Sequence, residues 1–170
     1  MNKKLKLWEL DRKSPENFRA QQKFPIVVIL DDIRSLNNVG SFFRTADAFN
    51  VTKIILGGIT ACPPHKDIRK TALGATETVD WAHSENLLEE IKVLQNAGYT
   101  VGSIEQTEKT TLLQDVAAFE AKPYALIFGN EVNGVRQELV DASDCVIEIP
   151  QFGTKHSFNA VSYTHLTLPT

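Results

Sequence analysis

The sequence predicts an α/β fold built on a mostly parallel sheet. Short apolar, β-rich runs alternate with helical patterns along most of the chain. The clearest runs are 25–30, 124–128 and 145–149, and each passes abruptly into polar, glycine or proline residues. In an open α/β sheet, ligands bind just beyond the carboxyl ends of the strands. The loops after these runs are therefore the first candidates for a functional site.

The first half of the chain carries clear start and stop signals. Ser14 followed by Pro15 is typical of a helix cap with proline in the first turn. Buried strands are predicted over 25–30 and 53–56, with a helix between them that ends near Asn50, a residue that tolerates the left-handed conformation. One apolar stripe defines this helix: Val39, Phe42, Phe43, Ala46 and Phe49.

The second half repeats the alternation. A long polar connection over 59–78 leads to a short predicted strand over 79–81. Ser84 is predicted to cap a helix that ends at Gly98. The apolar stripe of this helix is Leu87, Leu88, Ile91 and Leu94. The later predicted elements are a strand over 99–103, a weak apolar segment over 112–119, strands over 124–128 and 145–149, and a helix over 136–142.

Composition indicates one ordinary globular domain. The 170 residues are 42% hydrophobic and 23% charged. No run has the length of a membrane span, and the first residues lack the apolar core of a signal peptide. Cys62 and Cys145 show no metal-ligand spacing, so we expect free thiols in a reducing cytoplasm and no metal.

Positive charge is concentrated in two places although the net charge is −3. The first cluster lies within residues 1–23: Lys3, Lys4, Lys6, Arg12, Lys13, Arg19 and Lys23. The second comprises Lys66, Arg69 and Lys70. A local basic patch can bind phosphates in an acidic protein, whereas each cluster alone is also what a solvated surface looks like.

The first strand is followed by the segment Asn-Asn-Val-Gly-Ser-Phe-Phe-Arg, residues 37–44. It is neither the dinucleotide fingerprint nor a P-loop, which disfavours those enzyme classes. Gly40 and Arg44 share a helix face opposite the phenylalanine stripe. The absent side chain at Gly40 gives a substrate room to approach the guanidinium of Arg44, which can bind phosphate or polarise a hydroxyl. A plain surface arginine is the alternative.

The later loops add two further motifs. Phe-Gly-Asn-Glu-x-x-Gly follows one strand, with Gly129 and Gly134 allowing close backbone approach and Glu131 at the rim. Ile-Pro-x-x-Gly-x-x-x-Ser-Phe-Asn, residues 149–159, begins at the end of the last predicted strand, with Ser157 and Asn159 at the rim. If the two strands are neighbours, these loops form the floor and one wall of a pocket. Two ordinary strand-to-helix turns are the alternative.

The three motifs together resemble those of the TrmH (SpoU) family of RNA methyltransferases, in the SPOUT superfamily, over about residues 25–160. The resemblance implies a parallel sheet with helices on both faces and a deep carboxyl-terminal trefoil knot, in which S-adenosylmethionine binds. It also implies two sets of site residues. The catalytic set is Asn38, Arg44, Glu131, Ser157 and Asn159. The cofactor-binding set is Gly129, Ile149, Ser157 and Phe158.

The reaction implied by this resemblance is methylation of a ribose 2′-hydroxyl in tRNA or rRNA, by a homodimer whose active site is completed across the interface. Arg44 is the family's candidate for activating the hydroxyl, as a general base or as an electrostatic stabiliser, since arginine normally stays protonated. Two alternatives stay open. One is a catalytically weak RNA-binding module on the same fold, and the other is an unrelated α/β enzyme of small molecules.

The ends of the sequence are predicted to differ from the domain between them. Residues 1–24 are an expected lead-in, and residues 25–160 are the expected methyltransferase domain. After Ser-Phe-Asn the family continues with a helix rich in small residues, whereas residues 161–170 make a poor helix. We expect these ten residues to be non-native, because they read like a translated sequencing adapter. A genuine irregular tail is the alternative.

Overall fold

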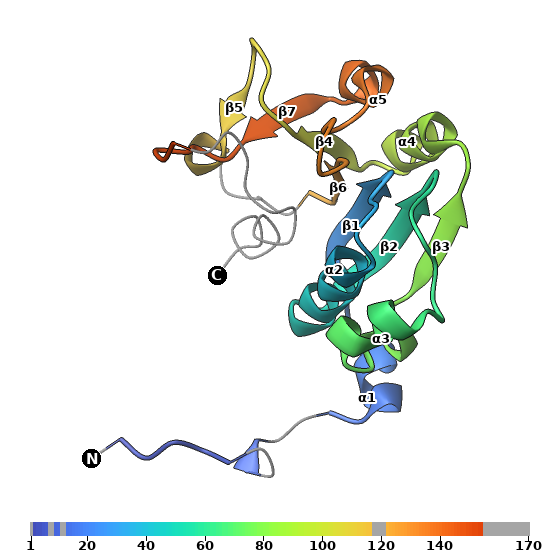
Figure 1. Cartoon of the computed structure of the whole chain (residues 1–170), viewed down its shortest axis with the longest axis vertical. Coiled ribbons are helices and arrows are strands. Elements are labelled where there is room, and N and C mark those ends of the chain that lie inside the picture. The colour runs from blue at the N-terminus through green and yellow to red at the C-terminus, as the bar shows by residue number, and fades with distance from the viewer. Residues whose placement is uncertain (1, 7–8, 11–12, 117–121, 155–170) are drawn as a thin grey trace.

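The structure is a computed structural model that describes residues 2–6, 9–10, 13–116 and 122–154. Its centre is a seven-stranded sheet of order β3-β2-β1-β6-β4-β7-β5, in which every strand pairing is parallel (Figure 1). The strands are β1 (Phe24–Asp31), β2 (Val51–Gly57), β3 (Trp81–Ser84), β4 (Thr100–Ile104), β5 (Thr111–Leu112), β6 (Tyr124–Phe128) and β7 (Cys145–Glu148). The helices are α1 (Pro15–Ala20), α2 (Leu36–Ala48), α3 (Lys66–Ala72), α4 (Leu87–Asn96) and α5 (Gln137–Ala142), with 3-10 turns η2 (Ala75–Glu77) and η3 (Leu113–Asp115).

Helices cover both faces of the sheet, as predicted. Alternate residues of β1 point to opposite sides, so Ile26, Val28 and Leu30 join the core beneath α2 and α3. Val27 and Ile29 join a second core beneath α4 and α5. Because both faces are buried, the central strands are apolar throughout, and they therefore appear in the sequence as continuous apolar runs.

Helix α2 confirms the predicted phenylalanine stripe but begins earlier than expected. Ser35 is its cap, and the Ser35 hydroxyl accepts a hydrogen bond from the Asn38 amide at 3.3 Å. Phe42 packs against Phe128 of β6 with ring centroids 5.1 Å apart. Asn50 has φ 55°, so it is the left-handed stop that the sequence predicted.

Gly40 has a different role from the one predicted. It is buried, and a Cβ atom added there lies 2.0 Å from Thr71 Oγ1 and 2.3 Å from the carbonyl oxygen of Ile68. The missing side chain therefore lets α3 pack closely on α2, and it does not open a path to Arg44. Gly40 thus faces a neighbouring helix rather than solvent, so its packing role overrides the expectation that it shares an open face with Arg44.

A strand boundary, a helix cap and the strand order also differ from the prediction. The third strand is β3 rather than 79–81, and Ser84 pairs with Gly57 at its end, so it does not cap the next helix. Asn86 is that cap, since its side chain accepts from the Glu89 amide. Strands β6 and β7 are not neighbours, because β4 lies between them.

The lead-in is attached to the domain at α1. Ser14 caps this helix and Pro15 occupies its first turn, as predicted. The Arg19 guanidinium donates to the carbonyl of Glu77, which brings α1 beside η2, the turn that follows α3 (Figure 1). In the described part of the chain, no helix is long and apolar enough to cross a membrane.

The contact between α2 and α3 yields a stability prediction. Replacing a mid-helix glycine by alanine ordinarily stabilises a helix by about 1 kcal/mol. Gly40→Ala is expected instead to lower the free energy of unfolding by about 1–3 kcal/mol, because the new methyl group overpacks the backbone of α3. Urea unfolding measures this change. Arg44→Ala, at an exposed position of the same helix, is the control. A stabilised Gly40→Ala protein contradicts the packing role.

Candidate functional site

The candidate site lies between two neighbouring strands, β1 and β6, whose following connections cross opposite faces of the sheet. From β1 the chain passes through α2, on one face of the sheet, to β2. From the neighbouring β6 it passes through α5, on the other face, to β7. The loops after β1 and β6 therefore face each other at the carboxyl edge of the sheet (Figure 1). Such a topological switch point is the usual ligand site of open α/β sheets.

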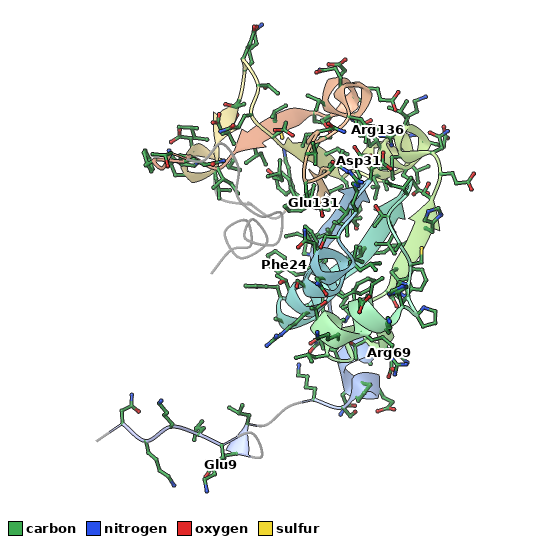
Figure 2. All side chains as sticks on the ribbon, viewed as in Figure 1. Glu9, Phe24, Asp31, Arg69, Glu131 and Arg136 are labelled. Atoms are coloured by element: carbon green, nitrogen blue, oxygen red, sulfur yellow. The ribbon has the colours of Figure 1, made fainter. Side chains whose placement is uncertain are left out.

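Glu131 joins the second sequence motif to the first. Its Oε1 accepts hydrogen bonds from Asn38 Nδ2 at 2.8 Å and from the Ser35 amide at 3.1 Å. Its Oε2 accepts from the Arg34 amide at 3.1 Å. The carboxylate therefore sits at the amino terminus of α2, where backbone N–H groups and the helix dipole favour negative charge (Figure 2).

These contacts fix the charge state of Glu131. Burial by itself raises the pKa of Glu131, but the hydrogen bonds from backbone amides and from Asn38 outweigh it and lower the pKa below the ordinary value of 4.5. The residue is ionised at neutral pH and is fully engaged as an acceptor. Its geometry is that of an anchor for the loop after β6.

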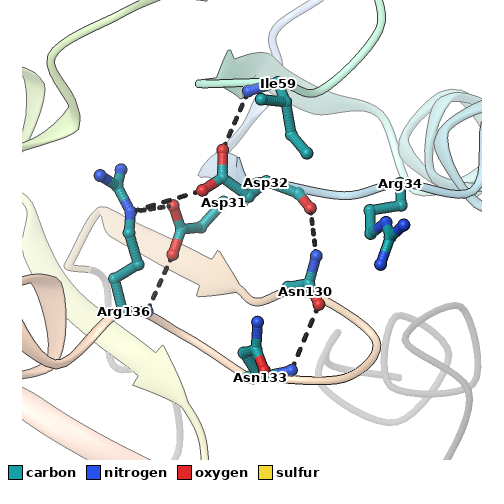
Figure 3. Close-up of a pocket in the computed structure, with 8 residues that line it drawn as sticks. Asp31, Asp32, Arg34, Ile59, Asn130, Asn133 and Arg136 are labelled. Atoms are coloured by element: carbon teal, nitrogen blue, oxygen red, sulfur yellow. Dashed lines mark hydrogen bonds and ion pairs between the residues drawn. The ribbon is translucent and has the colours of Figure 1, made fainter.

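A second anchor was not assigned from the sequence. Asp31, at the end of β1, is fully buried with 0% exposure. Its carboxylate accepts from Arg136 Nε at 2.8 Å and from the Arg136 amide at 2.9 Å (Figure 3). Burial lowers the pKa of Arg136, but the hydrogen bond and charge of Asp31, with the charges of Asp32 and Glu138, raise it overall. A carboxylate closing an apolar strand was the only sequence signal for this pair.

Asn130 supplies the third anchor and shapes the loop. Its Nδ2 donates to the carbonyl of Asp32 at 2.7 Å, while its Oδ1 accepts from the amides of Val132 and Asn133. The loop then folds back so that Asn130 and Gly134 exchange backbone hydrogen bonds. Gly134 has φ 69°, a conformation that suits glycine.

Gly129 is explained by the same fold-back. A Cβ atom at Gly129 lies 2.1 Å from both the carbonyl carbon of Gly134 and the amide nitrogen of Val135. The close approach expected from the sequence is therefore present, but its described partner is the loop's own backbone. Any larger residue at position 129 pushes the loop open.

The other side of this loop faces β4 and β7. Glu105, just past β4, accepts from the Val135 amide at 3.0 Å. Glu148 of β7 accepts from Gln106 and Thr110, which ties the loop after β4 to β7. Ile149, the buried residue after β7, lies at the same edge of the sheet. Gly129 and Ile149 thus flank the end of β4 from either side rather than meeting directly.

The remaining predicted residues are distributed unevenly. Asn38 and Glu131 meet, as described, whereas Arg44 is exposed and lies six residues farther along α2, about 9 Å of axial rise. Within 13–116 and 122–154, the Arg44 side chain makes no hydrogen bond or ion pair. Ser157, Phe158 and Asn159 lie outside the described residues, as does the segment expected to form the knot.

A pocket of about 310 Å³ opens on the β1 side of the loop (Figure 3). Its lining residues come from the ends of β1, β2 and β6: Asp31, Asp32, Arg34, Ile59, Asn130, Asn133, Gly134 and Arg136. Among the described residues, no group of three His, Cys, Asp or Glu side chains is placed to hold a metal ion. The pocket is therefore a mixed polar site built from amides, carboxylates and guanidinium groups.

Comparison with known proteins identifies the family. Residues 25–168 match the SpoU rRNA Methylase family. The chain belongs to this family. A putative TrmH family tRNA/rRNA methyltransferase of Staphylococcus haemolyticus is 34% identical over 79% of this chain and 53% of that protein. The 23S rRNA (guanosine-2′-O-)-methyltransferase RlmB of Vibrio parahaemolyticus is 29% identical over 89% of this chain and 60% of that protein.

Solved structures agree on the fold. The AdoMet-bound rRNA methyltransferase of Sinorhizobium meliloti superposes with a TM-score of 0.78 at 28% identity, over 92% of this chain and 59% of that chain. The TrmH/SpoU tRNA modifying enzyme of A. aeolicus gives the same TM-score at 24% identity, over 91% of this chain and 76% of that chain. The SPOUT-type sheet with helices on both faces is thus confirmed. The chain spans little more than half the length of the curated relatives it matches.

The Glu131 anchor yields a prediction of pH dependence. A folded-state pKa below the unfolded one means that ionised Glu131 stabilises the protein fully above about pH 4.5. This stabilisation is lost as the pH falls through the lower folded-state pKa. Glu131→Gln, which loses the charge and one acceptor, is expected to unfold more easily by about 1 kcal/mol at pH 7.

The deficit of Glu131→Gln is expected to shrink as the pH falls below 4.5, because the wild-type carboxylate is then protonated first in the unfolded chain and, at lower pH, in the folded protein. Thermal melts of both proteins between pH 3 and pH 7 measure it. Glu108→Gln, at an exposed glutamate in the loop between β4 and β5, controls for the general loss of negative charge. A deficit that does not change with pH contradicts the assigned role of the charge.

Proposed function

We propose that the chain is an S-adenosylmethionine-dependent methyltransferase that acts on a ribose 2′-hydroxyl of tRNA or rRNA. Family membership supports the reaction class. The observation that carries the proposal is the bond between Glu131 and Asn38, because it joins two of the family's motifs into one site at the switch point. The curated relatives named above act on rRNA, or on tRNA or rRNA.

The cofactor is proposed to lie on the β4–β7 side of the loop after β6. The described residues of the predicted binding set there are Gly129 and Ile149, which flank the end of β4. Ser157 and Phe158 would complete the binding set, as the resemblance implies. Bound there, the sulfonium supplies an activated methyl group, and this chain's residues hold and orient the acceptor.

Arg44 is proposed to act on the acceptor ribose or its phosphate. An arginine keeps its proton, so stabilising the developing charge on the 2′-oxygen suits it at least as well as removing the proton. In the family pattern Asn38, Glu131, Ser157 and Asn159 form the polar surroundings. In this structure Asn38 and Glu131 hold each other, which makes them organisers of the loop before any substrate arrives.

The active form is proposed to be a homodimer in the cytoplasm, acting without a metal ion. The position of Arg44 supports the proposed dimer. Arg44 is exposed to solvent and lies farther along α2 than the Asn38–Glu131 contact. A second copy can bring its Arg44 to this site. The carboxyl-terminal knot, the non-native nature of residues 161–170 and the boundary of the lead-in remain predictions of the sequence.

Methyl transfer tests the proposed function directly. The purified chain is incubated with methyl-labelled S-adenosylmethionine and with total RNA from cells that lack the gene. Label is expected in RNA, at ribose 2′ positions after nuclease digestion. Cofactor binding without any labelled RNA favours instead a catalytically weak RNA-binding module. Transfer of label only to small molecules contradicts the proposal.

Arg44→Ala is expected to separate catalysis from folding. Because the side chain is exposed and has no partner in the described part of the chain, the free energy of unfolding is expected to change by no more than about 0.5 kcal/mol. Single-turnover methylation is expected to fall by about 10²–10³. Arg44→Lys is expected to rescue little, since an ammonium lacks the planar fork. The control is Lys92→Ala at an exposed position of α4, and near-normal methylation by Arg44→Ala removes Arg44 from the mechanism.

Mixing two inactive variants tests the shared site. Arg44→Ala and Gly129→Leu are expected to be inactive alone, the first in catalysis and the second because the new side chain opens the loop. If each site takes residues from both copies, mixed dimers contain one intact site and recover partial methylation. Light scattering that shows a fully active monomer, or mixtures without any recovery, contradict the proposed dimeric site.

A further inference from the structure

The pocket on the β1 side of the loop after β6 has no role in the cofactor site just proposed. The loop over residues 129–135 separates the two regions. Its Val135 amide is held by Glu105 on the β4 side, while its Asn130 is held by Asp32 on the β1 side. A ligand in the pocket therefore lies across the loop from the proposed cofactor site, close to the amino terminus of α2.

The floor of the pocket is built from groups that hydrogen-bond to one another. Asp31 is buried and holds both the side chain and the backbone amide of Arg136. The Arg136 guanidinium also donates to Glu138 at 3.0 Å. Asn130 uses both its donor and its acceptor within the loop. These hydrogen bonds within the protein fix the shape of the cavity.

The rim, in contrast, carries uncommitted polar groups. Asp32 Oδ1 accepts from the Ile59 amide at 2.9 Å, but Asp32 Oδ2 lies 3.8 Å from Arg136 Nε, which is too far for a hydrogen bond. The side-chain amide of Asn133 and the guanidinium of Arg34 have no hydrogen-bond partner within 13–116 and 122–154. Figure 3 shows these three residues around the hollow, with the Ile59 side chain beside them.

The charges and shape of the pocket indicate the class of ligand. Two carboxylates and two guanidinium groups line it, so the formal charges balance and a neutral polar group fits better than a free anion. Ile59, 69% exposed, offers an apolar surface beside them. A splayed-out RNA base has this character, because it pairs an apolar face with a hydrogen-bonding edge.

We propose that the pocket receives a guanine base of the substrate RNA, with Asp32 and Asn133 contacting its edge and Arg34 contacting the adjoining phosphate. Guanine presents two adjacent N–H donors on its Watson–Crick edge, which one carboxylate can accept together. Adenine, cytosine and uracil each offer donors at a single position there. The Asn133 amide can donate to the guanine O6 or N7, and Arg34 suits a phosphate oxygen. This inference rests on the proposed function for its RNA, and it adds which side chains select the base.

Asp32→Asn is the most specific variant, because it preserves the backbone conformation at this position. Asp32 has φ 53°, a left-handed conformation that asparagine also adopts, and an asparagine oxygen can still accept from the Ile59 amide. Only the second carboxylate oxygen is replaced by a donor. Asn133→Ala and Arg34→Ala remove the other two uncommitted groups. Lys92→Ala, an exposed basic residue on α4 outside both basic clusters, is the matched control.

The test measures binding of GMP, IMP, AMP, CMP and UMP to the full chain by NMR titration, without cofactor. The wild type is expected to prefer GMP, with shifts at the amides of Ile59, Asn133 and Gly134. IMP, which lacks the guanine amino group, is expected to bind more weakly. Asp32→Asn is expected to weaken GMP binding about tenfold and leave AMP unchanged, since a hydrogen bond to a charged group is lost. Arg34→Ala is expected to weaken all nucleotides alike.

Equal binding of the five nucleotides by the wild type, or unchanged GMP binding by Asp32→Asn, overturns the pocket assignment. The nucleotide titration does not depend on methyl transfer, so the two proposals fail separately. If the chain methylates RNA but shows no guanine preference, the function stands and the pocket fails. If the preference is present and no RNA is methylated, the pocket stands and the proposed reaction fails.

Discussion

The buried contact between Asp31 and Arg136 is the interaction on which the site depends. A fully buried carboxylate is costly unless it is paired and hydrogen-bonded, and here both of its oxygens accept from one residue. Because Arg136 is the cap residue of α5, the pair fixes the point at which the loop after β6 ends. Glu131 fixes the middle of the same loop on α2, and Asn130 fixes its start on β1. Loss of the Arg136 side chain would leave the Asp31 carboxylate buried without its charged partner, which is why the arginine is hard to replace.

The fold was largely predictable because its strands are buried on both sides. Continuous apolar runs such as 124–128 leave a strong local signal, and Asn50 ended α2 as its side chain suggested. Strand order left no such signal. Nothing in the runs 124–128 and 145–149 shows that β4 separates them, since pairing partners far apart in the sequence are chosen by packing of the whole sheet.

The site was predictable in part for the same reason. Asn38 and Glu131 belong to recognisable motifs, and the structure brings them into contact. Asp31 and Arg136 are 105 residues apart and belong to no local pattern, so only the folded sheet reveals the pair. Gly40 shows a further limit. A glycine in a helix marks close approach, but the sequence does not say whether a ligand or another helix approaches, and here it is α3.

The order of strands in the sheet also has a consequence for synthesis on the ribosome. Strand β6 lies between β1 and β4, yet it is made after both. Until residues 124–128 emerge, the nascent chain has β1 with one open edge and β4 with no partner strand at all, since β4 pairs only with β6 and β7 among the described strands. Open edges of apolar strands are the usual templates for wrong pairing between chains. The chain up to β4 therefore exposes such edges, and β6 closes the gap between β1 and β4 just before the loop that carries Glu131 is made.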